Sequence, residues 1–215
     1  MSYYEFTTLD TVIFGGGKAA PAIEAWVKAG EGVLRGAWGT EIGTLNRVYL
    51  LREFDDFASM MAERDRALRS GDPFGCADLL TGIAMDSYRG ADFRPGCLEG
   101  ALGPVYEIRT YRPRIGALTA LDTAWEQAMP ERETYSKLAV VMRSLDGPHR
   151  WTQIWPYASL EERAAARGRS VKDGKWPPKG GPDLLLPEMR SDIALPMPFS
   201  PLRQSSPCIR CRSPS

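Results

Sequence analysis

The residues best suited to chemistry lie on one predicted strand, Val105–Tyr111. Strand alternation places Glu107, Arg109 and Tyr111 on one face and the intervening, partly apolar residues on the other. We expect the charged face to point into the interior of the fold. A buried carboxylate and guanidinium must be paired or hydrogen-bonded. Two hypotheses follow: a structural ion pair, or a pocket for an anion or carbonyl in which Arg109 supplies charge and Tyr111 a donor.

A second pattern lies in a predicted hairpin that contains Trp38, Glu41 and Asn46. Gly43 tolerates a positive φ and Asn46 can bond to local backbone, so a turn alone explains part of the pattern. A turn by itself does not require Trp38 or Glu41. An indole beside a carboxylate could line a small-ligand site, and Glu41 could act as a base if burial raised its pKa. Both interpretations stay open.

His149 is the only histidine in the chain. It follows Gly147 and Pro148, which favours a solvated turn, and it matches Asn46 across an internal repeat described below. A metal centre built from several histidines is excluded, while a single haem ligand remains an alternative. The sequence therefore predicts no metal and no cofactor, and it leaves any catalytic residue unknown.

Three glycines, Gly15–Gly17, precede Lys18 and a predicted helix. They lack the spacing of a phosphate-binding loop and the Ser or Thr after its lysine. We therefore interpret them as a flexible connector.

The four cysteines are Cys76, Cys97, Cys208 and Cys211. Since the first residues show no basic and apolar leader, we expect a cytoplasmic, reduced protein. Cys208 and Cys211 form a lone C-x-x-C within residues 203–215, which we expect to be a disordered tail, and its role is open.

An internal repeat divides the chain. Glu5 recurs as Glu107 and Arg47 as Arg150, at offsets of 102 and 103 residues. Each half shows the same periodicity, which predicts strands and helices in the order β-α-β-β-α-β. In the first half these are strand 3–9, helix 21–29, strands 33–41 and 46–52, a helix capped by Asp55 or Asp56, and strand 81–88. In the second they are strand 105–111, helix 117–129 ended by Pro130, strands 136–145 and 150–155, helix 159–169 and a weaker strand 189–195.

This element order is that of the ferredoxin-like fold. One such unit is an open sheet with helices on one face, so its other face needs cover. We predict an α+β protein in which two tandem ferredoxin-like βαββαβ units, 1–97 and 104–202, pack face to face. The result would be a pseudo-dimer resembling the dimeric α+β barrel. The charged face of Glu107 and Arg109 would then point into the barrel.

The sequence also resembles a known family. Residues 36–48, G-A-W-G-T-E-I-G-T-L-N-R-V, resemble the W-x-T-E-x-G-x-L-N signature of the NIPSNAP family, and residues 107–111, E-I-R-T-Y, resemble its opening strand E-L-R-x-Y. The resemblance covers about residues 3–202 and implies two NIPSNAP-like units of the barrel fold, linked in the family to trafficking and to no agreed catalytic residues. The second hairpin, R-S-L-D-G-P-H-R at 143–150, departs from the signature, as does Phe6-Thr7 in the first strand.

Composition excludes some classes of function. Lys and Arg total 27, as do Asp and Glu, so zero net charge argues against binding nucleic acid by bulk attraction. No uncharged stretch exceeds that of Trp151–Leu160, far short of the roughly 20 residues of a membrane span. The first hypothesis is a small apolar, oxygen-bearing molecule bound inside the barrel at Trp38, Glu41, Asn46, Glu107, Arg109, Tyr111 or His149. The alternatives are a non-enzymatic interaction or trafficking-type adaptor, an enzyme resembling cofactor-independent monooxygenases or isomerases, and a homodimer.

Overall fold

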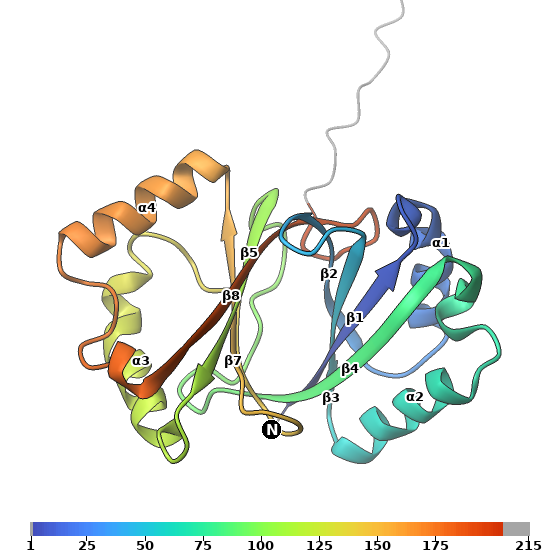
Figure 1. Cartoon of the computed structure of the whole chain (residues 1–215), viewed down its shortest axis with the longest axis horizontal. Coiled ribbons are helices and arrows are strands. Elements are labelled where there is room, and N and C mark those ends of the chain that lie inside the picture. The colour runs from blue at the N-terminus through green and yellow to red at the C-terminus, as the bar shows by residue number, and fades with distance from the viewer. Residues whose placement is uncertain (1, 204–215) are drawn as a thin grey trace, which may run out of the picture.

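Two sets of alternating strands and helices make up the chain (Figure 1). The computed structural model describes residues 2–203. The first set consists of β1 (Tyr3–Thr11), α1 (Gly15–Lys28), β2 (Val33–Ile42), β3 (Arg47–Phe54), α2 (Phe57–Arg69) and β4 (Leu80–Gly90). The second consists of β5 (Val105–Pro113), α3 (Leu118–Arg132), β6 (Val140–Ser144), β7 (Trp151–Tyr157), α4 (Leu160–Lys172) and β8 (Leu185–Pro196). Short 3₁₀ turns η1 (Pro73–Gly75), η2 (Ala77–Leu79) and η3 (Pro182–Leu184) precede β4 and β8.

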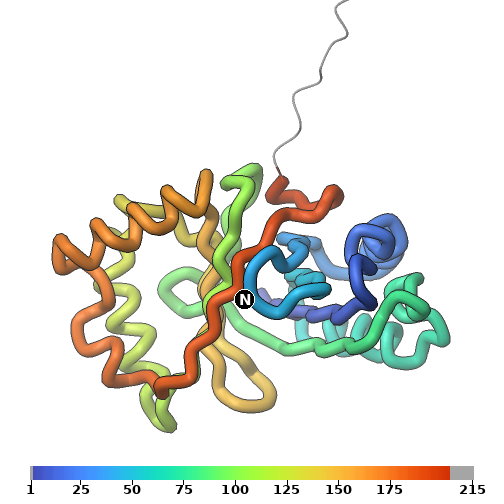
Figure 2. The backbone as a smooth tube through the Cα atoms, turned by 45° about the horizontal axis from the view of Figure 1, so that its top comes forward, coloured from blue at the N-terminus to red at the C-terminus, as the bar shows by residue number. Residues whose placement is uncertain are grey.

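The strands close into one antiparallel barrel in the order β1-β3-β2-β8-β5-β7-β6-β4. Each half supplies four neighbouring strands, and the halves join where β2 pairs with β8 and where β4 pairs with β6. Figure 2 shows β8, near the end of the chain, crossing the middle of the molecule. This arrangement confirms the predicted fold: two ferredoxin-like units forming one intramolecular barrel, which leaves no open sheet face for solvent.

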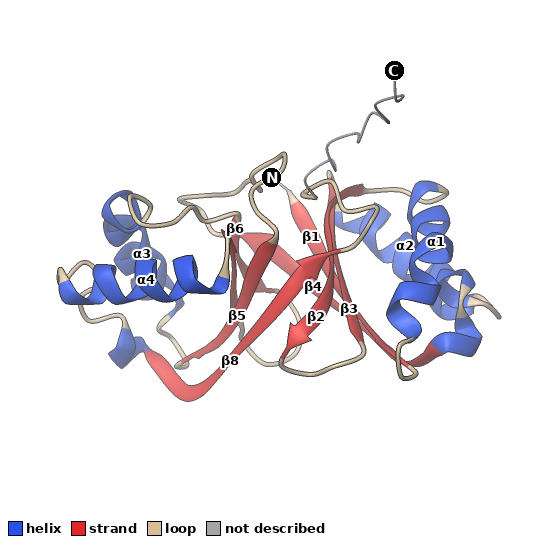
Figure 3. Cartoon of the chain, turned by 90° about the horizontal axis from the view of Figure 1, so that it is seen from above, coloured by secondary structure: helices blue, strands red, loops and turns tan. Residues whose placement is uncertain are grey.

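The helices lie outside the barrel in two pairs, α1 with α2 and α3 with α4, on opposite sides (Figure 3). Buried apolar residues gather accordingly in three clusters. One contains residues of all eight strands and fills the barrel, among them Phe6, Trp38, Tyr106 and Ile154. The other two lie between the sheet and each helix pair. Strands β1, β3 and β7 are therefore buried on both faces along most of their length.

Two helix boundaries differ from the sequence expectation. Gly15–Gly17 form the first turn of α1 rather than a connector. Close packing explains this, because a Cβ on Gly15 would lie 2.9 Å from the Cβ of Thr11. Helix α3 continues past Pro130 to Arg132. Pro130 lies in the last turn, where a missing N–H costs a single intrahelical bond.

The starts of α2 and α4 follow local capping. Asp56 caps α2 by accepting from Ser59 N at 2.9 Å, and Ser159 caps α4 by accepting from Glu162 N at 3.1 Å. None of the helices in residues 2–203 has the length and apolar character that a bilayer crossing requires. Cys76 and Cys97 are free thiols. The expected tail lies outside the described residues from position 204 onward, and so do Cys208 and Cys211.

Candidate functional site

Strand β5 places its charged face toward the helices and not inside the barrel. Tyr106 and Ile108 belong to the cluster that fills the barrel, and Tyr106 donates to the carbonyl of Leu202 at 3.1 Å. Glu107 instead contacts arginines of α4. The expectation that the face of Glu107 and Arg109 lines the barrel interior is therefore wrong. The physical reason is that a buried carboxylate needs opposite charge beside it, and the arginines that supply this charge to Glu107 lie on α4.

Glu107 is fully buried and is held by four partners. Its Oε1 accepts from Arg109 Nη1, Arg163 Nη2 and Ser191 Oγ, each at 2.6 Å. Arg167 Nη1 lies 3.7 Å from Oε2. Burial by itself would raise the pKa of Glu107, but the hydrogen bond from Arg163 and the charge of Arg109 outweigh it and hold the pKa at about 2. The carboxylate is consequently ionised at neutral pH.

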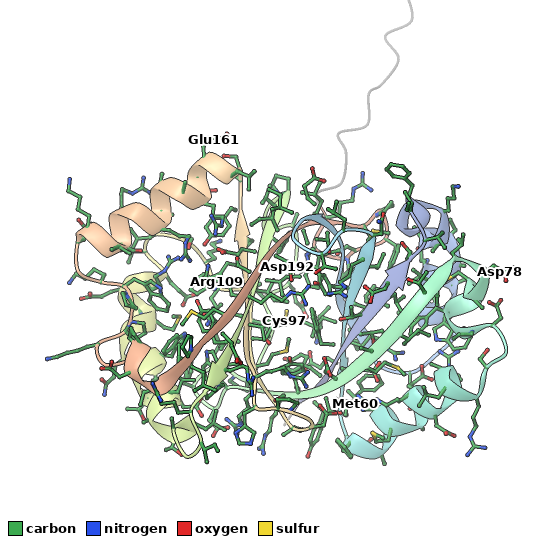
Figure 4. All side chains as sticks on the ribbon, viewed as in Figure 1. Met60, Asp78, Cys97, Arg109, Glu161 and Asp192 are labelled. Carbon is green, nitrogen blue, oxygen red and sulfur yellow. The ribbon has the colours of Figure 1, made fainter. Side chains whose placement is uncertain are left out.

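Arg109 connects this carboxylate to Tyr111 along the same strand face. Its Nε donates to Tyr111 Oη at 2.5 Å while Nη1 donates to Glu107. Because Tyr111 Oη accepts from Arg109, its own O–H remains able to donate. Figure 4 shows Arg109 on the side of the sheet that faces α4, whereas Asp192 lies nearer the centre of the molecule.

A pocket of about 250 Å³ opens between this face of the sheet and the helices α3 and α4. Tyr111 and Arg109 come from β5, Arg167 from α4 and Trp125 from α3. The rest of its lining is mainly apolar: Val171, Trp176, Pro177, Pro182, Leu185 and Met189. We call this space the α4 pocket. Apolar walls with a few convergent polar groups are typical of small-molecule sites.

Aromatic rings in edge contact build the wall of the α4 pocket. The ring of Trp125 lies 5.4 Å from that of Trp176 at an interplanar angle of 81°, and 6.4 Å from that of Tyr111 at 68°. Trp155 lies behind Trp176 at 6.1 Å. Edge-to-face pairs at these distances are mutually stabilising. The wall is thus held in place by ring packing.

The inside of the barrel, in contrast, is packed with side chains. Trp38 is fully buried there, and its ring lies 5.6 Å from that of Tyr106. At one mouth a smaller pocket of about 120 Å³ is lined by Tyr49, Tyr88 and Asp192 among others. Trp38 does not line it. The barrel interior therefore offers less space than the α4 pocket.

The other predicted site residues do not line this pocket: Glu41 lies near the end of β2, and Asn46 and His149 lie in turns. Glu41 and His149 are exposed, so neither carboxylate nor imidazole is enclosed. Asn46 has a φ of 55°, and its Oδ1 accepts from Phe14 N at 3.1 Å. The structure thus brings Glu107, Arg109 and Tyr111 together but separates them from Trp38, Glu41, Asn46 and His149.

Sequence reasoning missed Arg163, Arg167 and Trp176 as parts of this site. The signal for the arginines was their spacing of four on a capped helix, which puts both on one face. Trp176 lies in a proline-rich stretch without periodicity, so nothing local marked it. No three His, Cys, Asp or Glu side chains gather as a metal site in the part of the chain that the structure describes.

Solved structures with the same overall arrangement are found among enzyme-like proteins. An anthrone oxidase-like protein superimposes with a TM-score of 0.65 over 91% of this chain and 91% of its own, at 10% identity. A candidate monooxygenase of Lactobacillus acidophilus gives 0.63 over 91% and 93%, at 11% identity. At such identities the likeness concerns the fold.

Sequence comparison identifies relatives more directly. A NipSnap homologue of Dictyostelium discoideum is 24% identical over 143 residues, which are 66% of this chain and 64% of that protein, so the match spans less than two thirds of its length. The sequence model of the NIPSNAP family matches residues 15–73 and 106–201, one segment in each half. With both halves matched over most of their length, the chain belongs to the NIPSNAP family.

Proposed function

We propose that this protein binds a small apolar molecule with an oxygen-bearing group in the α4 pocket. The observation that carries the proposal is the joint lining of that pocket by Trp125 and Trp176 on one side and by Arg109 and Tyr111 on the other. A ring would lie against the indoles, and the oxygen would accept from the guanidinium or the phenol.

The proposed ligand is of the kind expected from the sequence, but its proposed site is the α4 pocket and not the barrel interior. Arg109 and Tyr111 stay as candidate binding residues. Glu107 becomes a positioning residue, because it is fully buried and holds Arg109 through Nη1 at 2.6 Å. Trp38 becomes a core residue of the barrel.

A pair of matched variants tests the place of binding. Met189 of β8 pairs with Tyr111 and lines the α4 pocket, whereas Ile83 of β4 pairs with Leu9 at the corresponding register of the first half. Both side chains are partly exposed, so each position accepts a larger one. Met189→Trp should fill the pocket, and Ile83→Trp should leave it open.

The measurement is calorimetric titration with 1-naphthamide, a neutral aromatic amide, and with its acid, 1-naphthoate. We expect at least one of the two to bind the unaltered protein and Ile83→Trp alike, and binding to fall about tenfold or more in Met189→Trp. Binding that survives Met189→Trp contradicts the proposal, and so does the absence of binding by both compounds.

A second candidate function, self-association, has its own observation. The β1–α1 loop exposes Ile13 and Phe14 to 72% and 82%, and the β2–β3 turn exposes Leu45 to 61%. The hydrogen bond from Phe14 N to Asn46 Oδ1 holds the two loops side by side. Phe14 has a φ of 58°, a conformation that costs energy for a bulky side chain.

We propose that a second copy of this chain covers these loops, since a two-fold interface uses the same patch on both copies. Sedimentation velocity should show a dimer that Phe14→Ser converts to monomer. A monomeric unaltered protein at high concentration contradicts this candidate and leaves the α4 pocket unaffected.

A further inference from the structure

Between α4 and the sheet, arginine side chains outnumber the carboxylates that contact them. Glu107 is the single carboxylate in ion-pair contact with Arg109, Arg163 and Arg167 within residues 2–203. Their distances from it are 2.6, 2.6 and 3.7 Å. One negative charge therefore faces three positive charges in a largely buried place.

A fourth arginine, Arg132 at the end of α3, adds to this excess. It is 1% exposed, and its guanidinium carbon lies 4.5 Å from the ring centre of Trp155 and 5.4 Å from that of Trp176. Its Nη1 donates to Ser136 Oγ at 2.7 Å. Across the described chain it has no carboxylate in ion-pair contact. A buried cation without an ion-pair partner is costly, and nearby negative charge would offset that cost.

At the equivalent position of the first half, the numbers of arginines and carboxylates are more nearly equal. Glu5 occupies the position of Glu107 and accepts from Arg52 at 2.6 Å and Arg64 at 3.2 Å. Glu63 adds a second carboxylate, which pairs with Arg52 at 2.9 Å and with Arg66 at 2.8 Å. Arg64 also reaches Asp146, at 3.4 Å.

Glu5 and Glu63 of the first half thus serve Arg52, Arg64 and Arg66 together with Asp146, which comes from the second half and is shared with Arg150. Because the two halves share one fold, the excess in the second half is a property of its own residues. The second half shares the framework and has fewer carboxylates beside its arginines.

Two of the surplus arginines line the α4 pocket. Arg109 uses Nε and Nη1 within the protein, and among the described residues its Nη2 has no hydrogen-bond partner. Arg167 likewise donates no side-chain hydrogen bond there and stays 3.7 Å from Glu107. Both guanidinium groups can therefore donate to a ligand oxygen without breaking an existing hydrogen bond.

We infer that the α4 pocket takes an anion, namely a ring-bearing or aliphatic carboxylate, with its carboxylate between Arg109 and Arg167 and its apolar body against Trp125 and Trp176. The inference rests on the proposed function, because it specifies the ligand of that pocket. A planar guanidinium matches the two oxygens of a carboxylate. The apolar walls suit the rest of such a molecule.

A matched pair of ligands separates charge from shape. 1-Naphthoate and 1-naphthamide share a ring system and differ in the negative charge. Calorimetric titration at neutral pH and low salt should show the acid binding about tenfold or more tightly than the amide, as charge-assisted hydrogen bonds provide. Added salt should reduce that preference.

A matched pair of variants assigns the preference to its residue. Arg167→Gln should reduce it to within about twofold, since the ligand loses one charged donor. Arg169→Gln removes the same charge two residues away on the same helix, at an exposed position, and should leave the preference intact. Arg167 is partly exposed and donates no hydrogen bond within the described residues, and Arg169 is exposed, so we expect both variants to fold, which circular dichroism checks.

The outcomes distinguish this inference from the proposed function. Equal binding of acid and amide, or a preference that Arg167→Gln leaves unchanged, overturns the carboxylate while the pocket stands. Absence of binding by both compounds overturns the pocket and the carboxylate together.

Discussion

Arg109 and Tyr111 are joined by a 2.5 Å hydrogen bond along one face of β5, at the floor of the α4 pocket. The guanidinium is fixed at one end by Glu107 and at the other by the phenol. A donor fixed in this way loses little conformational entropy when a ligand binds. The stability of this arrangement depends on Glu107.

Replacing Glu107 by Gln should destabilise the fold strongly. The change leaves Arg109, Arg163 and Arg167 without their carboxylate in a buried place, and breaking a buried pair from one side costs about 3–5 kcal/mol. Urea denaturation followed by circular dichroism measures the free energy of unfolding. Glu188→Gln is the control, because its partner Arg112 and Glu188 are both exposed, and such pairs contribute about 1 kcal/mol or less. Similar losses for both variants would contradict the role of Glu107.

The same carboxylate predicts how stability depends on pH. The pKa of Glu107 is lowered from 4.5 to about 2, since Arg163 and Arg109 outweigh the effect of burial. A group with a lowered folded pKa stabilises the protein above its unfolded pKa and loses that contribution as pH falls through the folded one. The contribution should therefore be complete above pH 4.5 and decline toward pH 2.

Urea midpoints of the unaltered protein and of Glu107→Gln, measured across that range, test this dependence. The difference between them should shrink with falling pH. A constant or growing difference would mean that Glu107 is not held in its ionised form.

Trp38 should behave as a core residue and not as a ligand contact. It is fully buried in the barrel, and its Nε1 has no partner among the described residues. Trp38→Ala should cost about 3–5 kcal/mol of unfolding free energy through the cavity it leaves. Trp38→Phe should cost less, because no hydrogen bond is lost, and should leave 1-naphthoate binding unchanged. Loss of binding in a folded Trp38→Phe protein would restore the barrel interior as the site.

Asn46 should serve the turn in which it lies. Its φ of 55° favours Asn or Gly, and its Oδ1 accepts from Phe14 N. Asn46→Ala should lower the unfolding free energy by about 1–2 kcal/mol, through backbone strain and the lost hydrogen bond. Asn46→Gly keeps the conformation and should cost less. If both variants fold normally yet lose naphthoate binding, Asn46 has a role at the pocket that its position does not explain.

Much of the fold could be predicted, because it follows from patterns that survive in both halves. The recurrence of Glu5 as Glu107 and of Arg47 as Arg150 identified the repeat, and period-two and period-3.6 segments gave the element order. Helix ends differ from the prediction where packing outweighs propensity, as at Gly15 and Pro130.

The orientation of β5 could not be predicted in the same way. Alternation shows which residues share a face, but β5 packs against side chains on both of its faces. Deciding between them requires knowing that Arg163 and Arg167 lie over the strand, which is a tertiary fact. The aromatic wall could not be predicted for the same reason, since Trp125 and Trp176 come from separate segments that meet only in the folded chain.

The most direct measurement of the central claim is a crystal structure of the protein with 1-naphthoate. We predict that the ring lies against Trp125 and Trp176, with carboxylate oxygens within hydrogen-bond distance of Arg109 or Arg167. Naphthoate inside the barrel or at its mouth beside Tyr49 and Asp192, or an α4 pocket filled by side chains and without ligand, would contradict it.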